Sequence, residues 1–344
     1  MSCIARSTSL CEQNKQRKDW ADALRALAMF FVIFGHLLGW IPIYFIVTSP
    51  IKIPLFFVIT GYVFNYRRTD TSAFFKNIFR KLVVPWLCLT IPFVFLKVPE
   101  FGFSVIPREI DYILSGVVIW YMPCCIIAEI IWFFIAKNGR TPLCIAVMAL
   151  LVFAMGVVAA QLGVLDFAMI SRAMIVQFFI LCGFLMKLWE DKWSRINWPG
   201  VFLLIAVYAG FVLISTVLWP NQCLDVHVNR YYNYPFCFAM IVLGCFVLFA
   251  ASRKFFEDER HHVPALISFF GQNTLVFYLL HNRNIQLISA LLARFSIPPA
   301  LLLIIKLVLT YVMCSLEALL INRFLPGLLG KKKRSPFPDG RLNC

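Results

Sequence analysis

Long apolar runs separated by short polar breaks follow one another along almost the whole chain. A helix needs about 20 mostly apolar residues to cross a bilayer, and ten of the runs come close to this length. They are predicted over about 22–41, 51–66, 80–97, 109–136, 142–162, 171–189, 199–219, 233–251, 264–281 and 297–325. The fourth and tenth runs are long enough to be tilted or broken. The pattern therefore predicts an all-α, polytopic membrane bundle of about ten transmembrane helices.

The composition agrees with a membrane protein. Hydrophobic residues make up 61% of the chain and charged residues only 14%, whereas a soluble domain carries about 25% charged residues. Ten spans fill most of the 344 residues. We expect a single integral membrane domain over 1–344, with a polar lead over 1–19 and a basic tail over 331–344. The lead lacks the apolar region and cleavage site of a signal peptide, so the first span is expected to stay attached.

The positive charges predict how the bundle is oriented. When successive breaks are assigned to alternating sides of a membrane, most lysines and arginines fall on the side that holds both termini. Such an excess marks the cytoplasmic side, so both termini are predicted to be cytoplasmic. The same bias explains the net charge of +15 without a nucleic-acid partner, and none is expected.

The cysteines do not indicate a metal site or a disulfide framework. The twelve are scattered, mostly within apolar runs, with no C-x-x-C pair and no metal-ligand spacing. No metal is therefore expected.

The first apolar run contains two ionisable residues, Arg25 and His36. Eleven helical positions bring the two side chains to within about 20° of one direction and about 16 Å apart along the axis. Ionisable groups inside a span are by default candidates for a functional site. An imidazole can take a proton from a hydroxyl or attack an acyl carbon; alternatively, His36 hydrogen-bonds a neighbouring helix. Asp22 can pair with Arg25, which on its own could also be a surface anchor.

Basic residues flank the connection between the second and third runs. Arg67, Arg68, Arg80 and Lys81 either do no more than orient the protein or form a phosphate-binding mouth, because guanidinium groups match phosphate oxygens. At the end of the second run, Thr60 precedes a glycine, which permits close approach of another helix or a ligand chain.

Two carboxylates, Glu129 and Glu317, fall inside predicted spans. Each can be protonated, pair with a basic group or line a cavity, and the sequence leaves these alternatives open. The external loop over about 220–233 contains Asp225, His227 and Arg230. Its length is compatible with a lid or a recognition loop.

The ninth run carries a polar stripe. Asn273, Thr274 and Tyr278 lie close to helical i, i+4 spacing, and His281 is predicted near the external end of the same span. The stripe makes these side chains candidates for contact with an acceptor substrate.

Four of these segments, in order, resemble the membrane-bound acyltransferase-3 family. The segments are Asp22-x-x-Arg25 with His36, Pro54-x-Phe56-Phe57-x-x-Thr60-Gly61-Tyr62, Arg80-Lys81-Leu-x-x-Pro85, and Gly271-x-x-Thr274-Leu-x-x-Tyr278-Leu-x-His281. Trp120-Tyr121 resembles an aromatic pair of the family. The resemblance implies a ten-helix, multi-pass protein of the bacterial inner membrane. It also implies transfer of an acyl group, usually acetyl, from cytoplasmic acetyl-CoA to a carbohydrate hydroxyl, with acetyl-CoA as donor substrate and no permanently bound cofactor.

The resemblance also implies roles for individual residues. Arg25 and His36 match the pair taken as essential for catalysis. The acyl-CoA would be bound by Arg67, Arg68, Arg80 and Lys81, and the acceptor by Trp120, Tyr121, Asn273, Tyr278 and His281. Asp22, Thr60 and Glu129 would support the site. Thr60 stands where many members have serine, and the hydroxyl is retained.

Two rival functions remain at this point. A transporter of a lipid-linked sugar or acidic solute could use Glu129, Glu317 and His36 as a proton relay, although the chain lacks the internal repeat of many transporters. A non-catalytic scaffold for polysaccharide assembly would make changes at His36 and Arg25 silent. The sugar, the hydroxyl, the size of the acyl group, direct transfer or an acyl-histidine intermediate, and the oligomeric state are all left open.

Overall fold

The computed structural model describes the backbone of residues 2–64, 70–256 and 263–331, and within these ranges the side chains from residue 20 onward. This part of the chain is built from helices, with a single isolated bridge between Asp225 and Arg230 and no strand. Nine of the described helical segments are long and apolar enough to cross a membrane. The prediction of an all-α polytopic bundle is confirmed.

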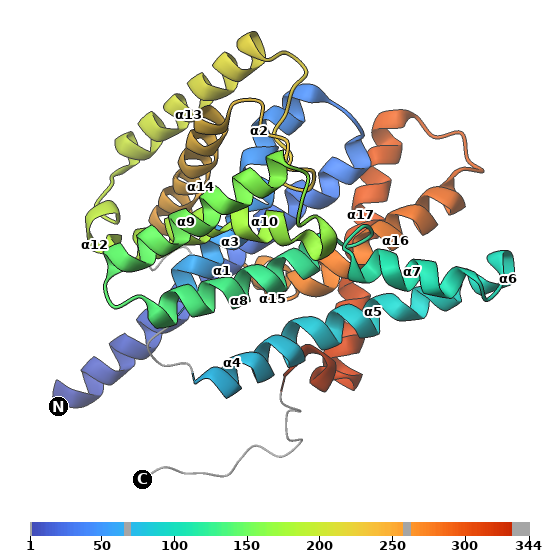
Figure 1. Cartoon of the computed structure of the whole chain (residues 1–344), viewed down its shortest axis with the longest axis horizontal. Helices are drawn as coiled ribbons and strands as arrows, with labels where there is room; N and C mark the ends of the chain where they lie inside the picture. The colour runs from blue at the N-terminus through green and yellow to red at the C-terminus, as the bar shows by residue number, and fades with distance from the viewer. Residues whose placement is uncertain (1, 65–69, 257–262, 332–344) are drawn as a thin grey trace.

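The first half of the chain contains five of these nine segments (Figure 1). Its elements are α1 (Ser2–Leu38), α2 (Pro42–Lys52), α3 (Pro54–Val63), α4 (Thr71–Ile78), η2 (Phe79–Val83), α5 (Val84–Phe95), α6 (Val98–Phe101), α7 (Val105–Leu114), α8 (Tyr121–Asn138) and α9 (Pro142–Gln161). Pro42 and Pro54 each stand in the first turn of a helix, where a missing N–H costs nothing. The second span therefore begins at Pro42, earlier than the predicted residue 51. The predicted fourth run is broken into α7 and α8.

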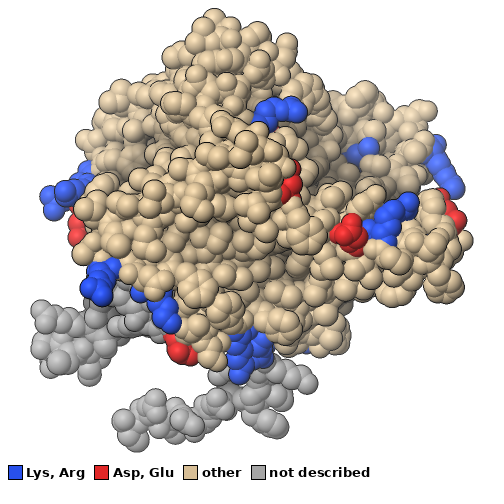
Figure 2. Space-filling model, in the orientation of Figure 1, with Lys and Arg blue, Asp and Glu red and all other residues tan. Residues whose placement is uncertain are grey.

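The second half of the chain contains the other four candidate spans. Its elements are η3 (Phe167–Met169), α10 (Ile170–Ile175), α11 (Gln177–Leu188), α12 (Glu190–Trp193), α13 (Trp198–Leu218), α14 (Tyr234–Phe256), α15 (Ala265–Gln272), α16 (Thr274–Leu292), α17 (Pro299–Phe324) and η4 (Pro326–Leu329). Helices α9, α13 and α17 leave most of their apolar residues uncovered, as expected of helices that face lipid. Figure 2 shows a broad uncharged area on the left of this face, with Lys and Arg along its lower left edge and further charged residues at the upper centre and on the right.

The segment predicted as a continuous ninth span is a broken helix. Helix α15 ends at Gln272 and α16 begins at Thr274 and continues to Leu292, so the predicted boundaries 264–281 are wrong. The segment still runs beside α1, because Gly271 lies against the Asp22 backbone and His281 lies against His36. This broken helix is not among the nine candidate spans of the described chain, so a tenth crossing stays a prediction.

The start of the apolar part of α1 and the C-terminal end of the described chain lie on the same side of the bundle, which we call the Asp22 end. Lys331 confirms this geometry, because its Nζ donates to Asn273 Oδ1 at 3.3 Å, two residues from the glycine that packs on Asp22. The opposite side is called the His36 end. That the Asp22 end is cytoplasmic stays a prediction from the charge distribution.

Helices α3 and α11 pack in close contact at the centre of the bundle. A Cβ added at Gly61 would lie 1.9 Å from the carbonyl oxygen of Ile180, so only glycine permits this approach. The sequence predicted close packing at this position. This close contact fixes the position of α3 relative to α11.

Glu190 forms a buried ion-pair cluster at the Asp22 end. Lys187 Nζ donates to it at 2.5 Å and Arg253 pairs with its second oxygen. Burial opposes ionisation of Glu190, but the hydrogen bonds from Lys187 and Arg253 outweigh it and lower its pKa to about 2.

We expect Glu190→Gln to destabilise the protein by about 3 kcal/mol at neutral pH, because the substitution leaves two cations without their carboxylate. Since the folded-state pKa is depressed, the stabilisation is complete above the ordinary value of 4.5 and is lost as the pH falls towards about 2. Thermal unfolding in detergent of wild type and E190Q, compared between pH 7 and pH 3, measures both effects. A difference between the two proteins that is as large at pH 3 as at pH 7 would contradict the assignment.

Candidate active site

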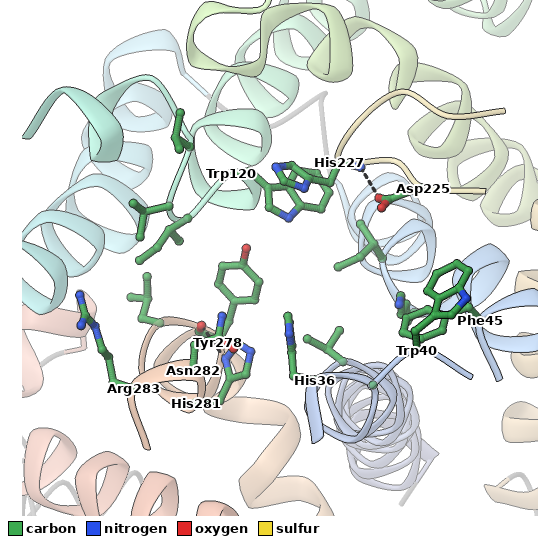
Figure 3. A pocket seen from close by; sticks show the side chains of 18 residues that line it. His36, Trp40, Phe45, Trp120, Asp225, His227, Tyr278, His281, Asn282 and Arg283 are labelled. Atoms are coloured by element: carbon green, nitrogen blue, oxygen red, sulfur yellow. Dashed lines mark hydrogen bonds between the residues drawn. The ribbon is translucent and has the colours of Figure 1, made fainter. Parts of the chain in front are cut away.

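A cavity of about 490 Å³ opens at the His36 end of the bundle. Its walls come from the end of α1, the middle of α16, helix α2 and the α2–α3 junction, residues 117–120 before α8, and the loop between α13 and α14. Figure 3 shows the labelled aromatic and polar side chains surrounding this space. Five segments that are distant in sequence thus converge on one site.

Two histidines lie together on the wall of this cavity. The ring centroids of His36 and His281 are 5.1 Å apart, with the ring planes tilted by 48°. His36 is exposed to the cavity, whereas the His281 side chain is buried. The break at Asn273 and the contact of Gly271 with Asp22 set α16 in the register that brings His281 to His36.

The hydrogen bonds of His281 assign its tautomer. Its Nδ1 lies 2.9 Å from the carbonyl oxygens of both Phe277 and Tyr278. Because carbonyl oxygens only accept, Nδ1 carries the proton and Nε2 carries a lone pair. Within the part of the chain that the structure describes, buried Nε2 has no hydrogen-bond partner. A buried acceptor without a donor is costly, so this nitrogen is a strong candidate for a functional contact.

Tyr278 stands beside the histidine pair. Its ring lies 5.9 Å from His281 and 5.0 Å from Tyr121, and its hydroxyl accepts the backbone N–H of Tyr121 at 3.3 Å. Trp120, the residue before Tyr121, lines the cavity. Four of the five residues predicted to contact the acceptor are thus brought together.

Asn273 is the member of that predicted group that lies elsewhere. Its side-chain oxygen accepts from Asn322 and Lys331 at the Asp22 end, and its Nδ2 donates to the carbonyl oxygen of Phe269. The structure therefore gives Asn273 a role in holding α15 and α17 together, away from the cavity.

The loop between α13 and α14 contributes to the cavity wall. The His227 ring stacks on Trp120 with the ring centroids 5.1 Å apart. The backbone N–H of His227 donates to Asp225 Oδ1 at 2.9 Å, and its backbone carbonyl accepts from Arg172. Burial lowers the pKa of His227, so its ring is neutral at pH 7. The sequence predicted a lid or recognition loop here, and His227 and Asp225 do line the cavity.

The predicted basic residues that the structure describes lie at the Asp22 end of the bundle. Arg25 donates to Asp22 at 2.7 Å, so the predicted pairing is present. Arg80 and Lys81 are exposed on η2, next to Gly330. Arg67 and Arg68 lie outside the described residues. The structure therefore separates a cationic group at the Asp22 end from the histidine pair at the His36 end.

Two predicted supporting residues have local partners. Thr60 Oγ1 donates to the carbonyl oxygen of Phe56 in its own helix at 3.0 Å. The thiol of Cys125 donates to Glu129 Oε1 at 3.8 Å. Glu129 lies two turns along α8 from Tyr121, towards the Asp22 end.

Sequence reasoning missed several cavity residues: Trp40, Phe45, Lys52, Asn282 and Arg283. In the sequence, Lys52 and Arg283 stood out only as two of the few positive charges on the side opposite the termini. A lysine inside an apolar run was the signal that could have identified Lys52.

Comparison with known protein families decides the class of this protein. The model of a family described as an acyltransferase domain, acyltransferase-3, matches residues 18–317. The chain belongs to the acyltransferase-3 family. The matched region runs from α1 into α17 and includes all the site residues named above. Searches of curated proteins and of solved structures found no match. The protein is thus a multi-pass membrane acyltransferase.

Proposed function

We propose that this acyltransferase moves an acetyl group from cytoplasmic acetyl-CoA to a sugar hydroxyl of a cell-envelope polysaccharide or its lipid-linked precursor, in the inner membrane of a bacterium. The observation that carries the proposal is the His36–His281 pair on the wall of a cavity lined by aromatic and polar side chains. Mostly apolar cavities with a few placed polar groups are typical of small-molecule sites.

The donor is proposed to enter from the Asp22 end. Its phosphates would lie near Arg25, Arg67, Arg68, Arg80 and Lys81, because guanidinium and ammonium groups bind phosphate oxygens. Its pantetheine arm would follow α1, along which Arg25 and His36 are about 16 Å apart. The thioester would then reach His36 from one side while the sugar occupies the cavity on the other.

In the proposed mechanism, His281 positions His36. A ring N–H of His36 donates to the free Nε2 of His281, which leaves the other His36 nitrogen unprotonated and directed at the substrates. A base oriented by a second hydrogen-bonding group follows the logic of hydrolase triads. The two rings already lie in contact, and such hydrogen bonds tighten when substrate binds.

The unprotonated nitrogen of His36 serves either of two routes. In direct transfer it takes the proton of the sugar hydroxyl, the oxygen bonds to the thioester carbon, the C–S bond breaks, and the proton passes to the departing CoA thiolate. In the second route a His36 nitrogen bonds to the acyl carbon, the C–S bond breaks and CoA leaves as the thiolate; the sugar oxygen then bonds to the acyl carbon, the bond to His36 breaks, and the hydroxyl proton ends on the CoA thiolate. Both routes yield the acylated sugar and CoA.

His281→Phe is expected to reduce the rate of acyl transfer by about 10²-fold or more, the range contributed by a positioned acid–base group. His281→Gln retains an acceptor oxygen, so we expect it to recover part of the rate. The effect should fall on kcat rather than on KM for the acceptor, and the pH–rate profile of H281Q should differ from that of wild type. A purely structural role would instead lower the amount of folded protein and leave the profile of the remaining enzyme unchanged.

The function itself is tested with radiolabelled acetyl-CoA. Membranes containing the protein and membranes without it are incubated with the label, and radioactivity is followed into the envelope glycan fraction. Label in glycan only when the protein is present supports the proposal. Absence of label, together with proton-coupled solute uptake into vesicles that lack acetyl-CoA, would contradict it in favour of a transporter.

A further inference from the structure

The cavity at the His36 end contains two cations whose charge no neighbouring carboxylate neutralises at close range. Lys52 lines both the main cavity and an adjoining one of about 70 Å³, and Arg283 lines the main cavity. Among the described residues, neither forms an ion pair within 4.0 Å; Lys52 Nζ lies 4.4 Å from the ring centroid of Phe45, and the Arg283 guanidinium 5.4 Å from that of Phe93.

Two other cations towards the same end, Lys97 and Arg172, do form ion pairs. Lys97 donates to Glu109 at 2.6 Å, and Arg172 pairs with Asp166. Among the described residues, Arg230 and Arg294 also form no ion pair within 4.0 Å, but both are exposed and line neither cavity, whereas Lys52 and Arg283 face the main one. Asp225 is the carboxylate on the cavity wall, and its Oδ1 accepts a hydrogen bond from the backbone N–H of His227 at 2.9 Å. With one carboxylate against two cations, the charged lining of the cavity is net positive.

The same walls offer surfaces for a sugar ring. Trp40 is 58% exposed and stacks on Phe45 at 5.1 Å, and Trp120 stacks on His227 at the same distance. Trp40, Phe45 and Trp120 line the adjoining cavity together with Lys52 and Asp225. The C–H face of a pyranose packs on an aromatic ring, and an aromatic wall beside a cation recognises a sugar that carries negative charge. A charge-assisted hydrogen bond in such a partly desolvated site is stronger than one between neutral groups.

We infer that the acceptor is an acidic glycan, whose carboxylate or phosphate binds Lys52 while its sugar ring rests between Trp40 and Trp120. Arg283, which lies across the cavity from Trp40 and Phe45 (Figure 3), binds a second acidic group further along the glycan. This inference rests on the proposed function, because it names the substrate of the same site. A carboxylate and a phosphate share the chemistry that Lys52 recognises.

Binding tests the inference without acyl transfer. The purified protein is titrated with a hyaluronan hexasaccharide, with the same hexasaccharide after reduction of its carboxylates to alcohols, and with a glycerol-phosphate oligomer, using tryptophan fluorescence. We expect at least one acidic probe to bind about 10-fold or more tightly than the neutral one. Lys52→Gln should remove this preference and Lys52→Arg should retain it. Arg294→Gln, which removes an exposed cation that lines neither cavity, is the matched control and should behave as wild type.

Equal binding of neutral and acidic probes, or binding of acidic probes that is as tight in K52Q as in wild type, would overturn the inference. So would an absence of binding to all three probes. The hexasaccharide and the glycerol-phosphate oligomer distinguish a carboxylate ligand from a phosphate ligand. Preferential binding of an acidic probe that depends on Lys52, in a protein that transfers no acetyl group, would support the acidic-ligand site and reject the proposed transferase function.

Discussion

Replacement of His36 by alanine is expected to lower the transfer of label from acetyl-CoA to glycan by 10³-fold or more. The variant loses the nitrogen that, in the proposed mechanism, accepts the hydroxyl proton or the acyl group, and with it the ring that lies against His281. Such a loss corresponds to about 4 kcal/mol of transition-state stabilisation. Initial rates in membranes, normalised to the amount of protein, provide the measurement.

Two controls give this prediction its meaning. Thr60→Ser retains the hydroxyl that donates to Phe56, so its rate should match that of wild type. H36A should be present in the membrane at the wild-type level, because its side chain projects into the cavity rather than into the core. Undiminished acetylation by H36A would show that His36 takes no part in the reaction.

The same variant separates the two chemical routes. When wild type is given labelled acetyl-CoA without acceptor, an acyl-histidine intermediate would leave label covalently attached to the protein and releasable by hydroxylamine. H36A would carry none. Wild type without covalent label, but with active transfer once acceptor is added, would establish direct transfer.

The fold was predictable because its strongest signal is local. Each apolar run reports on a helix of its own, and the runs over 142–162 and 199–219 match α9 and α13 closely. The breaks were harder to predict, because they depend on distant contacts. Asn273 illustrates this: its side chain is held by Asn322 near the end of α17 and by Lys331, which follows η4. The helix stops there, and the predicted polar stripe does not continue across the break.

The site was only partly predictable for the same reason. Spacing within one helix can place Arg25 and His36 on a common face, but it cannot say which other segment meets that face. The meeting of His36 with His281 depends on the register between α1 and α15, and the positions of Lys52 and Asp225 depend on how α2 and the α13–α14 loop fold over the end of α1. Such long-range contacts leave no periodic trace in the sequence.

The register between α1 and α15 makes Gly271 the second position where a substitution is expected to have a large effect. Gly271 packs directly on α1, and a Cβ at this position would lie 2.0 Å from the carbonyl oxygen of Asp22 and 2.7 Å from its Cα. Backbone atoms cannot move aside as the end of a side chain can, so Gly271→Ala must separate α15 from α1. Because α16 continues from α15, the shift also carries His281 away from His36.

We therefore expect Gly271→Ala to lower both the yield of folded protein and the activity of what does fold. Overpacking of this kind typically costs about 1–3 kcal/mol, so the melting temperature in detergent should fall, and acyl transfer per folded molecule should drop by about 10-fold or more. Gly210→Ala is the matched control, since a Cβ at Gly210 on α13 meets nothing within 4 Å. If G271A melts and transfers acetyl groups as G210A does, the contact with Asp22 does not set the histidine pair, and the positioning role given to His281 loses its structural basis.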